Sequence, residues 1–214
     1  MLEPYLIKYK PNTLSDVLID DNIKDIIRTL ININHIFMLI VGDGETGKTT
    51  LVNTIVKEYF GEGINYDDNV LIINSLKEQG IQYYKNDVKT FCQTRCSIKD
   101  KNKIIVIDDI DNINDQGQCI FRNCLDKYEN QVHFILTCQN VQKVLQGIQC
   151  RVMIIKLKKI SSKNLINIAK QIVAKEDIDI DDECLNFLLT ISNNSSCLLH
   201  SFDLLLSYYI TTCI

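Results

Sequence analysis

The chain has 214 residues, of which 46% are hydrophobic and 23% charged, and its formal net charge is −4. These values are typical of a globular protein with a sizeable core, and they exclude collagen-like, low-complexity and disordered chains. The longest apolar run covers residues 36–41, far fewer than the roughly 20 that a membrane-spanning helix needs. No basic stretch followed by an apolar one stands at the N-terminus, so the nine cysteines predict reduced thiols in an intracellular protein.

The hydrophobic pattern predicts helices and strands in alternation up to residue 158. Helical spacing of apolar residues marks segments 21–34, 48–60, 83–92 and 115–128. Continuous apolar runs, typical of strands buried on both faces, occupy segments 36–41, 70–73, 103–107, 132–137 and 152–157. This order predicts an α/β fold in which helices cover both faces of a parallel sheet.

The pattern changes after residue 158, where no further strand is predicted. Three helical segments follow at residues 163–174, 182–191 and 196–209, and either Ser161 or Ser162 is suited to cap the first. The sequence therefore predicts two units, an α/β domain at residues 1–158 and a small three-helix domain at residues 159–214.

Three of the eight glycines, Gly42, Gly44 and Gly47, lie within six residues between a predicted strand and a predicted helix. Residues 42–49 read GDGETGKT and match the phosphate-binding pattern G-x-x-x-x-G-K-[ST] in the strand–loop–helix context that it requires. Such a loop turns its N–H groups inward, and the N-terminus of the helix adds partial positive charge. The alternative, a glycine turn before a helix that merely begins with Lys-Thr, leaves this agreement unexplained.

The loop predicts binding of ATP and Mg²⁺. Lys48 is expected to reach the β- and γ-phosphates, and the Thr49 hydroxyl is expected to ligate Mg²⁺. The other residues of this segment that we expect at the nucleotide are Gly42, Asp43, Gly44, Glu45, Thr46, Gly47 and Thr50.

An acidic pair, Asp108-Asp109, follows the predicted strand at residues 103–107. Parallel sheets bind ligands in the crevice at the carboxyl ends of their strands, which is where such a pair lies. We assign Asp108 to Mg²⁺, directly or through water, and Asp109 to polarising the attacking water. The alternative is that these residues and Asp111 cap the following helix, and for Asp111 we favour that interpretation.

Five further segments carry a distributed pattern. They read KYKPNTL at residues 8–14, NSLKEQGI at 74–81, FRNCLD at 121–126, FILTCQ at 134–139 and IQCR at 148–151. With the phosphate loop, they resemble boxes of the small subunits of replication factor C-type clamp loaders, which are AAA+ ATPases. The resemblance covers almost the whole chain and implies an AAA+ P-loop core followed by a helical lid.

The resemblance also implies roles for single residues. Lys8 and Tyr9 correspond to residues near the adenine, and Gln139 to an asparagine that positions the attacking water. Arg151 corresponds to an arginine finger, whose guanidinium stabilises phosphate charge in a neighbouring subunit. For Arg151 the alternative is a surface arginine at the start of a strand.

Three departures from the family pattern bear on activity. Glu45 stands where the family has glycine, Asp109 replaces a glutamate that is one methylene longer, and Leu199 replaces a lid arginine. Because misplacement by an ångström can lower a rate about 100-fold, we expect slow hydrolysis. Nucleotide binding is better supported than turnover.

The partners implied by the resemblance are other clamp-loader subunits, a sliding clamp and primer–template DNA, in the nucleus or at a viral or cytosolic replication site. Lys85 and Lys89 lie four apart on a predicted helix and share a face, where they would contact the DNA backbone. The alternative is an ordinary solvated helix face, and the negative net charge does not itself indicate a nucleic-acid-binding protein.

The predicted function is ATP-driven loading of a sliding clamp onto DNA. The alternatives are a largely non-hydrolysing subunit that binds ATP and donates Arg151 to a neighbour, another AAA+ ATPase of DNA metabolism, and a small-molecule kinase. Family members continue beyond the lid into a collar domain, so a chain that stops at Ile214 is interpreted as a fragment or a reduced member.

Two minor features complete the predictions. Cys92 and Cys96 form C-x₃-C, but no second pair or histidine follows at metal-ligand spacing, so no structural zinc is predicted. His133 lies in an apolar strand and is interpreted as a packed core residue.

Overall fold

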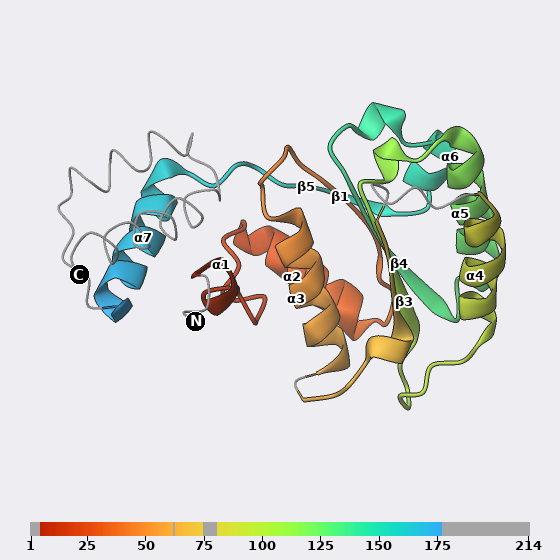
Figure 1. Ribbon diagram of the computed structural model, residues 1–214, viewed down its shortest axis with the longest axis horizontal. Coiled ribbons are helices and arrows are strands. Elements are labelled where there is room, and N and C mark those ends of the chain that lie inside the picture. The colour runs from red at the N-terminus through yellow and green to blue at the C-terminus, as the bar shows by residue number, and fades with distance from the viewer. Residues whose placement is uncertain (1–4, 62, 75–80, 177–214) are drawn as a thin grey trace, which may run out of the picture.

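The computed structural model describes residues 5–61, 63–74 and 81–176 (Figure 1). Its centre is a parallel sheet with strand order β2-β3-β4-β1-β5. The strands are β1 (Phe37–Val41), β2 (Val70–Asn74), β3 (Lys103–Asp108), β4 (Val132–Cys138) and β5 (Met153–Lys156). The predicted α/β architecture with a parallel sheet is therefore confirmed.

Helices precede, connect and follow the strands. The α-helices are α1 (Tyr5–Lys8), α2 (Asp21–Asn32), α3 (Lys48–Phe60), α4 (Ile81–Gln93), α5 (Asp115–Tyr128), α6 (Gln146–Gln149) and α7 (Ser162–Glu176). Short 3₁₀ helices are η1 (Asp67–Asn69), η2 (Ile110–Asn112) and η3 (Val141–Lys143). The predicted helix at residues 21–34 ends two residues early, because Asn34 adopts a left-handed conformation with φ of +53°.

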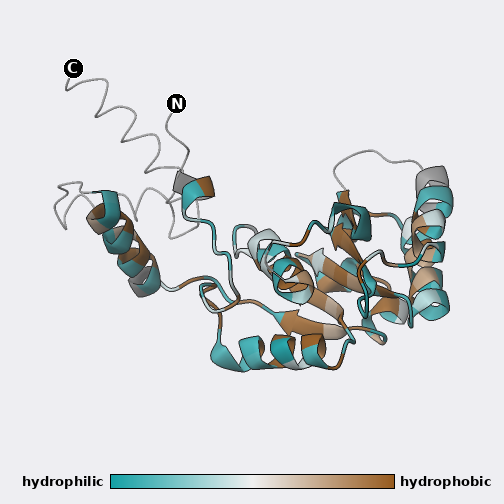
Figure 2. Cartoon of the chain, turned by 90° about the horizontal axis from the view of Figure 1, so that it is seen from below, coloured by the Kyte–Doolittle hydropathy of each residue, from teal (hydrophilic) through white to brown (hydrophobic). Residues whose placement is uncertain are grey.

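Each central strand contributes alternate side chains to two hydrophobic layers. Met38 and Ile40 pack with residues of α2 and α3, such as Ile55. Leu39 and Phe134 face the opposite layer, where α4, α5 and α6 cover the sheet. Figure 2 shows the strands as a hydrophobic layer between helices of mixed polarity.

Burial is complete in the central strands and incomplete at the edges of the sheet. Every residue of β4 is buried. In contrast, Ile72 of β2 is 60% exposed, and Met153 and Ile154 of β5 are 44% and 39% exposed. The prediction of a sheet covered on both faces is thus correct for β1, β3 and β4, which are the strands that carry the site.

His133 of β4 is a core residue, as predicted, with 1% of its surface exposed. Its Nδ1 accepts a hydrogen bond from Ile36 N at 3.4 Å, so the proton lies on Nε2, which donates to Asn34 Oδ1 at 3.1 Å. Burial, reinforced by repulsion from His35 and Lys101, lowers the pKa of His133 to about 4. The imidazole is therefore neutral at physiological pH.

The first helix of the predicted lid is α7, which lies beside the N-terminal segment and away from the sheet (Figure 1). Ser161 caps it, since its Oγ accepts from Asn164 N at 3.3 Å and its carbonyl accepts from Leu165 N at 3.1 Å. The other two predicted lid helices, at residues 182–191 and 196–209, and Leu199 lie outside the described residues.

No helix within the part of the chain that the structure describes is long and apolar enough to cross a membrane.

Candidate nucleotide and metal site

The site lies at the carboxyl ends of β1, β4 and β3. Because β4 lies between β1 and β3, the loop that follows β1 and the acidic pair that ends β3 flank the end of β4. This is the edge at which parallel sheets bind their ligands.

The loop between β1 and α3 has two positions that require glycine. A Cβ atom at Gly42 would lie 2.6 Å from Thr46 Oγ1, which itself donates to the carbonyl of Asp43 at 2.9 Å. Gly47 has a φ of +83° and forms the N-cap of α3. The two glycines thus shape the start of the loop and its entry into α3.

Lys48 is the best-buried charged group of this loop, with 8% of its surface exposed. Its Nζ donates to the carbonyl oxygens of Gly42 and Asp43, both at 2.9 Å. The ammonium group is therefore held inside the curve of the loop, where a bound phosphate would meet it. The carboxylate of Asp43 pairs with Lys159 at 3.6 Å.

The two residues predicted to bind Mg²⁺ are brought together across the sheet. Thr49 Oγ1 donates to Asp108 Oδ2 at 3.4 Å. A hydroxyl and a carboxylate are the hard oxygen ligands that Mg²⁺ takes when nucleotide phosphates and water complete its octahedron. Elsewhere, within the described ranges, no three His, Cys, Asp or Glu side chains are grouped to hold a metal ion.

Asp109 follows Asp108 with a φ of +52°, which is the left-handed region that few non-glycine residues adopt. Burial raises the pKa of the Asp109 carboxyl, and the charges of Asp108 and Asp111 raise it further, against the lowering effect of Lys48. A carboxylate with a raised pKa is a better proton acceptor, which suits the predicted role.

Asp111 does not cap the following helix, and that prediction is wrong. The cap of α5 is Asn114, whose side chain accepts from Gly117 N at 2.9 Å. Asp111 lies one turn too early and instead accepts from the backbone N–H groups of Gln139 and Asn140, at 3.2 and 2.9 Å. The carboxylate thereby anchors the exposed segment after β4 that carries Gln139.

Thr137, near the end of β4, is a site residue that sequence reasoning missed. It is fully buried, and its Oγ1 donates to Asp108 Oδ1 at 2.6 Å while accepting from Asp109 N at 2.9 Å. The sequence offered one signal for Thr137, which is the polar residue within the otherwise apolar segment 134–138.

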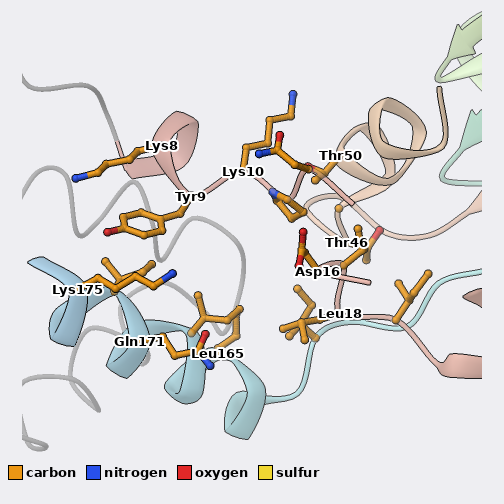
Figure 3. Close-up of a pocket in the computed structure, with 18 residues that line it drawn as sticks. Lys8, Tyr9, Lys10, Asp16, Leu18, Thr46, Thr50, Leu165, Gln171 and Lys175 are labelled. Carbon is orange, nitrogen blue, oxygen red and sulfur yellow. The ribbon is translucent and has the colours of Figure 1, made fainter. Parts of the chain in front are cut away.

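A cavity of about 540 Å³ opens beside the phosphate loop (Figure 3). Its walls come from the N-terminal segment, the start of α3 and α7, and the predicted nucleotide contacts that line it are Lys8, Tyr9, Thr46, Gly47 and Thr50. Gly42, Asp43, Gly44, Glu45, Lys48 and Thr49 are not among the lining residues. Sequence reasoning missed the apolar wall from α7, formed by Leu165, Ile168 and Ile172.

A polar cluster closes one end of this cavity. Glu176 Oε1 accepts from Lys8 Nζ at 2.5 Å and from the Tyr9 hydroxyl. The Nζ of Lys175 lies 5.6 Å from the centre of the Tyr9 ring, and Figure 3 shows the two side chains facing each other between the N-terminal segment and α7. Lys8 and Tyr9 thus join the core to the lid helix.

Three further predicted residues, Arg151, Lys85 and Lys89, neither line the cavity nor belong to the phosphate loop or the acidic pair. Arg151, at the end of α6, pairs through Nε with Asp126, and its Nη1 donates to the carbonyl of Gly147 at 2.6 Å. Lys85 and Lys89 are exposed on α4. The structure does not bring these residues to the phosphate loop of the same chain.

A family model described as "ATPase family associated with various cellular activities (AAA)" matches residues 38–159. A replication factor C small subunit of Acanthamoeba polyphaga mimivirus is 30% identical over 191 residues, which are 89% of this chain and 59% of the relative. Replication factor C subunit 4 of Saccharomyces cerevisiae is 28% identical over 190 residues, which are 87% of this chain and 58% of the relative. The chain spans about three fifths of the length of these curated relatives.

Two solved structures share the fold. The Thermotoga maritima RuvB Holliday junction branch migration motor superposes with a TM-score of 0.69 at 15% identity, covering 89% of this chain and 62% of its own. A DNA polymerase III gamma subunit-related protein of the same organism gives a TM-score of 0.63 at 16% identity, and the match covers 85% of this chain and 57% of that protein.

Proposed function

Because this chain belongs to the AAA family of ATPases, we propose that it binds and hydrolyses Mg²⁺-ATP as a subunit of a clamp loader, which places a sliding clamp on primer–template DNA. The observation that carries the ATPase part is the pairing of Thr49 Oγ1 with Asp108 Oδ2 at 3.4 Å beside the glycine loop. The clamp-loader part is supported by similarity to curated replication factor C subunits along most of the chain.

The adenosine portion of ATP enters the cavity between the N-terminal segment and α7, against Tyr9 and the apolar wall of α7. Its phosphates lie along the loop and the N-terminus of α3, where N–H groups and the helix dipole attract anions. Lys48 Nζ then exchanges its bonds to the carbonyls of Gly42 and Asp43 for bonds to phosphate oxygens.

Thr49 and Asp108 would hold Mg²⁺, which when bound neutralises charge on the β- and γ-phosphate oxygens. Asp109 accepts a proton from the attacking water as the water oxygen bonds to the γ-phosphorus. The bond from that phosphorus to the bridging oxygen breaks, and ADP leaves with the electron pair. Gln139 orients the water through its amide, on a segment that Asp111 anchors.

Arg151 acts in a neighbouring subunit. It lies on the surface at the end of α6, and the guanidinium side chain is 41% exposed. An exposed ion pair such as that with Asp126 contributes little stability, so the guanidinium is available to a γ-phosphate brought close by assembly.

Lys85 and Lys89 of α4 contact the phosphates of DNA in this proposal, at a nuclear, viral or cytosolic replication site. Both are exposed, whereas Val88 of the same helix is buried. Replacing both by alanine should reduce the slope of log affinity against log salt by about 1 to 2, whereas Lys99→Ala should not. An unchanged slope would remove these lysines from the interface.

The test of the proposal is ATP turnover by the chain together with its partner subunits, sliding clamp and primer–template DNA. Turnover should rise when clamp and DNA are added, and Lys48→Ala should abolish it, while Lys99→Ala serves as the matched control. Turnover by the chain alone that ignores partners, clamp and DNA would overturn the clamp-loader proposal. Stimulation by DNA alone would favour another AAA+ ATPase of DNA metabolism.

A second candidate is a subunit that binds ATP, hydrolyses it hardly at all and donates Arg151 to its neighbour. It is favoured by Asp109, which is one methylene shorter than the glutamate of the family pattern. Assemblies carrying Asp109→Ala or Arg151→Ala distinguish the two functions. Loss of turnover with only the Arg151 substitution would indicate the donor role.

A further inference from the structure

We propose that Thr137 is the positioning residue that orients Asp108 and Asp109 for Mg²⁺, a role that rests on the proposed nucleotide-binding function. No part of the phosphate-loop pattern or the acidic pair includes this residue. Its place in the sheet and its two hydrogen bonds assign it the role.

The strand order gives Thr137 its position. β4 pairs with β1 on one side, where Thr137 is opposite Ile40, and with β3 on the other, where Leu136 is opposite Ile107. The residue after Leu136 therefore lies level with Asp108, at the point where β3 gives way to the acidic loop. Thr137 is the side chain between the strand of the phosphate loop and the strand of the carboxylates.

The two carboxylate oxygens of Asp108 have different partners, and the Thr137 hydroxyl binds one of them. Thr137 Oγ1 donates to Oδ1 at 2.6 Å, and Oδ2 is left facing the Thr49 hydroxyl at 3.4 Å. A carboxylate fixed through one oxygen cannot rotate freely. The other oxygen is therefore pre-oriented toward the place where Thr49 would share a metal ion.

The same hydroxyl stabilises the backbone of Asp109. Asp109 has a φ of +52°, in the left-handed region that few residues with a Cβ atom adopt. The N–H of Asp109 donates to Thr137 Oγ1 at 2.9 Å, which holds the peptide group between Asp108 and Asp109. Thr137 thus fixes the direction in which the Asp109 side chain leaves the chain.

Strand propensity alone does not account for a threonine here. Threonine favours strands, but β4 is buried along its whole length, and a buried hydroxyl without partners is unfavourable. Valine has the same shape and would suit such a strand. The Thr137 hydroxyl instead has both partners that it needs, because it donates to the Asp108 carboxylate and accepts from the backbone N–H of Asp109.

The experiment measures the Mg²⁺ concentration that half-saturates nucleotide binding, with a fluorescent ATP analogue and Mg²⁺ titrated from an EDTA-treated sample of the full chain. Thr137→Val and Thr137→Ala should raise this concentration about 10- to 100-fold, the usual effect of losing a group that orients a metal ligand. Thr137→Ser retains the hydroxyl and should restore a value near that of the wild type. Nucleotide binding in EDTA should be the same in all four proteins.

Thr54→Val is the matched control, because Thr54 is equally buried but donates only to the carbonyl of Thr50. Thr137→Ala provides the same measurement if the valine variant does not fold. An unchanged Mg²⁺ requirement in the variants, or a serine variant as impaired as the valine variant, would overturn the role of Thr137 alone. Wild-type nucleotide binding that ignores Mg²⁺ would overturn the proposed function as well.

Discussion

Two residues of the nucleotide site, Glu45 and Asp109, adopt the left-handed backbone conformation that suits glycine, with φ of +63° and +52°. At Asp109, the hydrogen bond from its N–H to Thr137 supports the conformation. Glu45 is exposed in the phosphate loop, and its position is the one at which the clamp-loader pattern has glycine. Backbone strain of this kind is concentrated at functional sites. The positive φ of Glu45 explains why the clamp-loader pattern has glycine at this position.

Replacing Glu45 with glycine should therefore stabilise the protein. Removing the Cβ relieves about 1–2 kcal/mol of strain, against an entropy loss of about 0.5–1 kcal/mol for glycine, so the free energy of unfolding should rise by up to about 1.5 kcal/mol. Urea denaturation measures the change. Glu129→Gly is the matched control, because Glu129 has a φ of −49° and its replacement should destabilise. Equal destabilisation by the two substitutions would show that Glu45 is not strained.

His133 should make stability depend on pH between 6.5 and 4. Its folded-state pKa of about 4 lies below the usual value of 6.5, so the unfolded chain binds the proton first as pH falls. The free energy of unfolding should then decrease across this window, by at most about 3 kcal/mol from this group.

The measurement is urea denaturation at several pH values, comparing His133→Gln with the wild type. The loss of stability between pH 6.5 and 4 should be smaller in the variant, whereas His35→Gln, at an exposed position, should retain most of it. A variant with the same pH dependence as the wild type would mean that His133 is not the group that titrates.

At the scale of elements, the sequence predicts segments with a clear periodicity and misses those without one. The strands and α3, α5 and α7 follow from their apolar patterns, whereas α1 and α6 have four residues each, too few for a periodic signal. The error at Asp111 has a similar origin, because a cap can be assigned only when the first residue of the helix is known. Here α5 begins at Asp115, so that Asn114 takes the cap position.

The last residue of the lid helix α7, Glu176, attaches this helix to the N-terminal segment. Glu176 lies at the negative end of the α7 dipole, where a carboxylate is unfavourable. Its hydrogen bonds from Lys8 and Tyr9 compensate for this, and they lower the pKa of the Glu176 carboxyl. Because Lys8 and Tyr9 also line the cavity, the same contact connects the lid to the predicted nucleotide position.

Glu176→Ala should therefore accelerate nucleotide release. Without the carboxylate, Lys8 and Tyr9 lose their bond to α7, and the lid opens more often; we expect dissociation several-fold faster with little change in association. Stopped-flow displacement of a fluorescent nucleotide measures both rates. Glu129→Ala, in the loop after α5, is the control, and a release rate that is the same in both variants would contradict a role for the Glu176 contact.

At the scale of the whole molecule, the site depends on which strands are neighbours. Lys48 and Thr49 could be proposed because they end a phosphate-loop pattern between a recognisable strand and helix, and Asp108 because it comes at the end of a recognisable strand. The role of Thr137 could not, since it requires that β4 lie between β1 and β3, an order that local sequence patterns do not determine. The apolar wall from α7 was missed for the same reason, because its periodicity indicates a helix and not what the helix covers.

The placement of Arg151 gives a prediction about assembly. Arg151 follows the C-cap residue of α6, where it is partly exposed and pairs with Asp126, so we expect it to act on the nucleotide of a second subunit. Arg151→Ala should lower turnover by at least about 1,000-fold, as loss of an arginine finger does, and Lys48→Ala should abolish it. An equal mixture should regain activity, because an intact loop in one subunit can then meet an intact Arg151 in the next. With random assembly, about one interface in four is of this kind.

The measurement is ATP turnover of assemblies that hold the partner subunits and several copies of this chain, prepared with each variant and with the mixture. Two different affinity tags verify that both variants enter one assembly. Lys99→Ala mixed with Lys48→Ala is the control, since it supplies intact loops as well as intact arginines. Recovery in the mixture of the Arg151 and Lys48 variants follows only if the arginine acts across an interface. Mixed assemblies that form without regaining turnover would place the action of Arg151 within its own chain, or outside the reaction altogether.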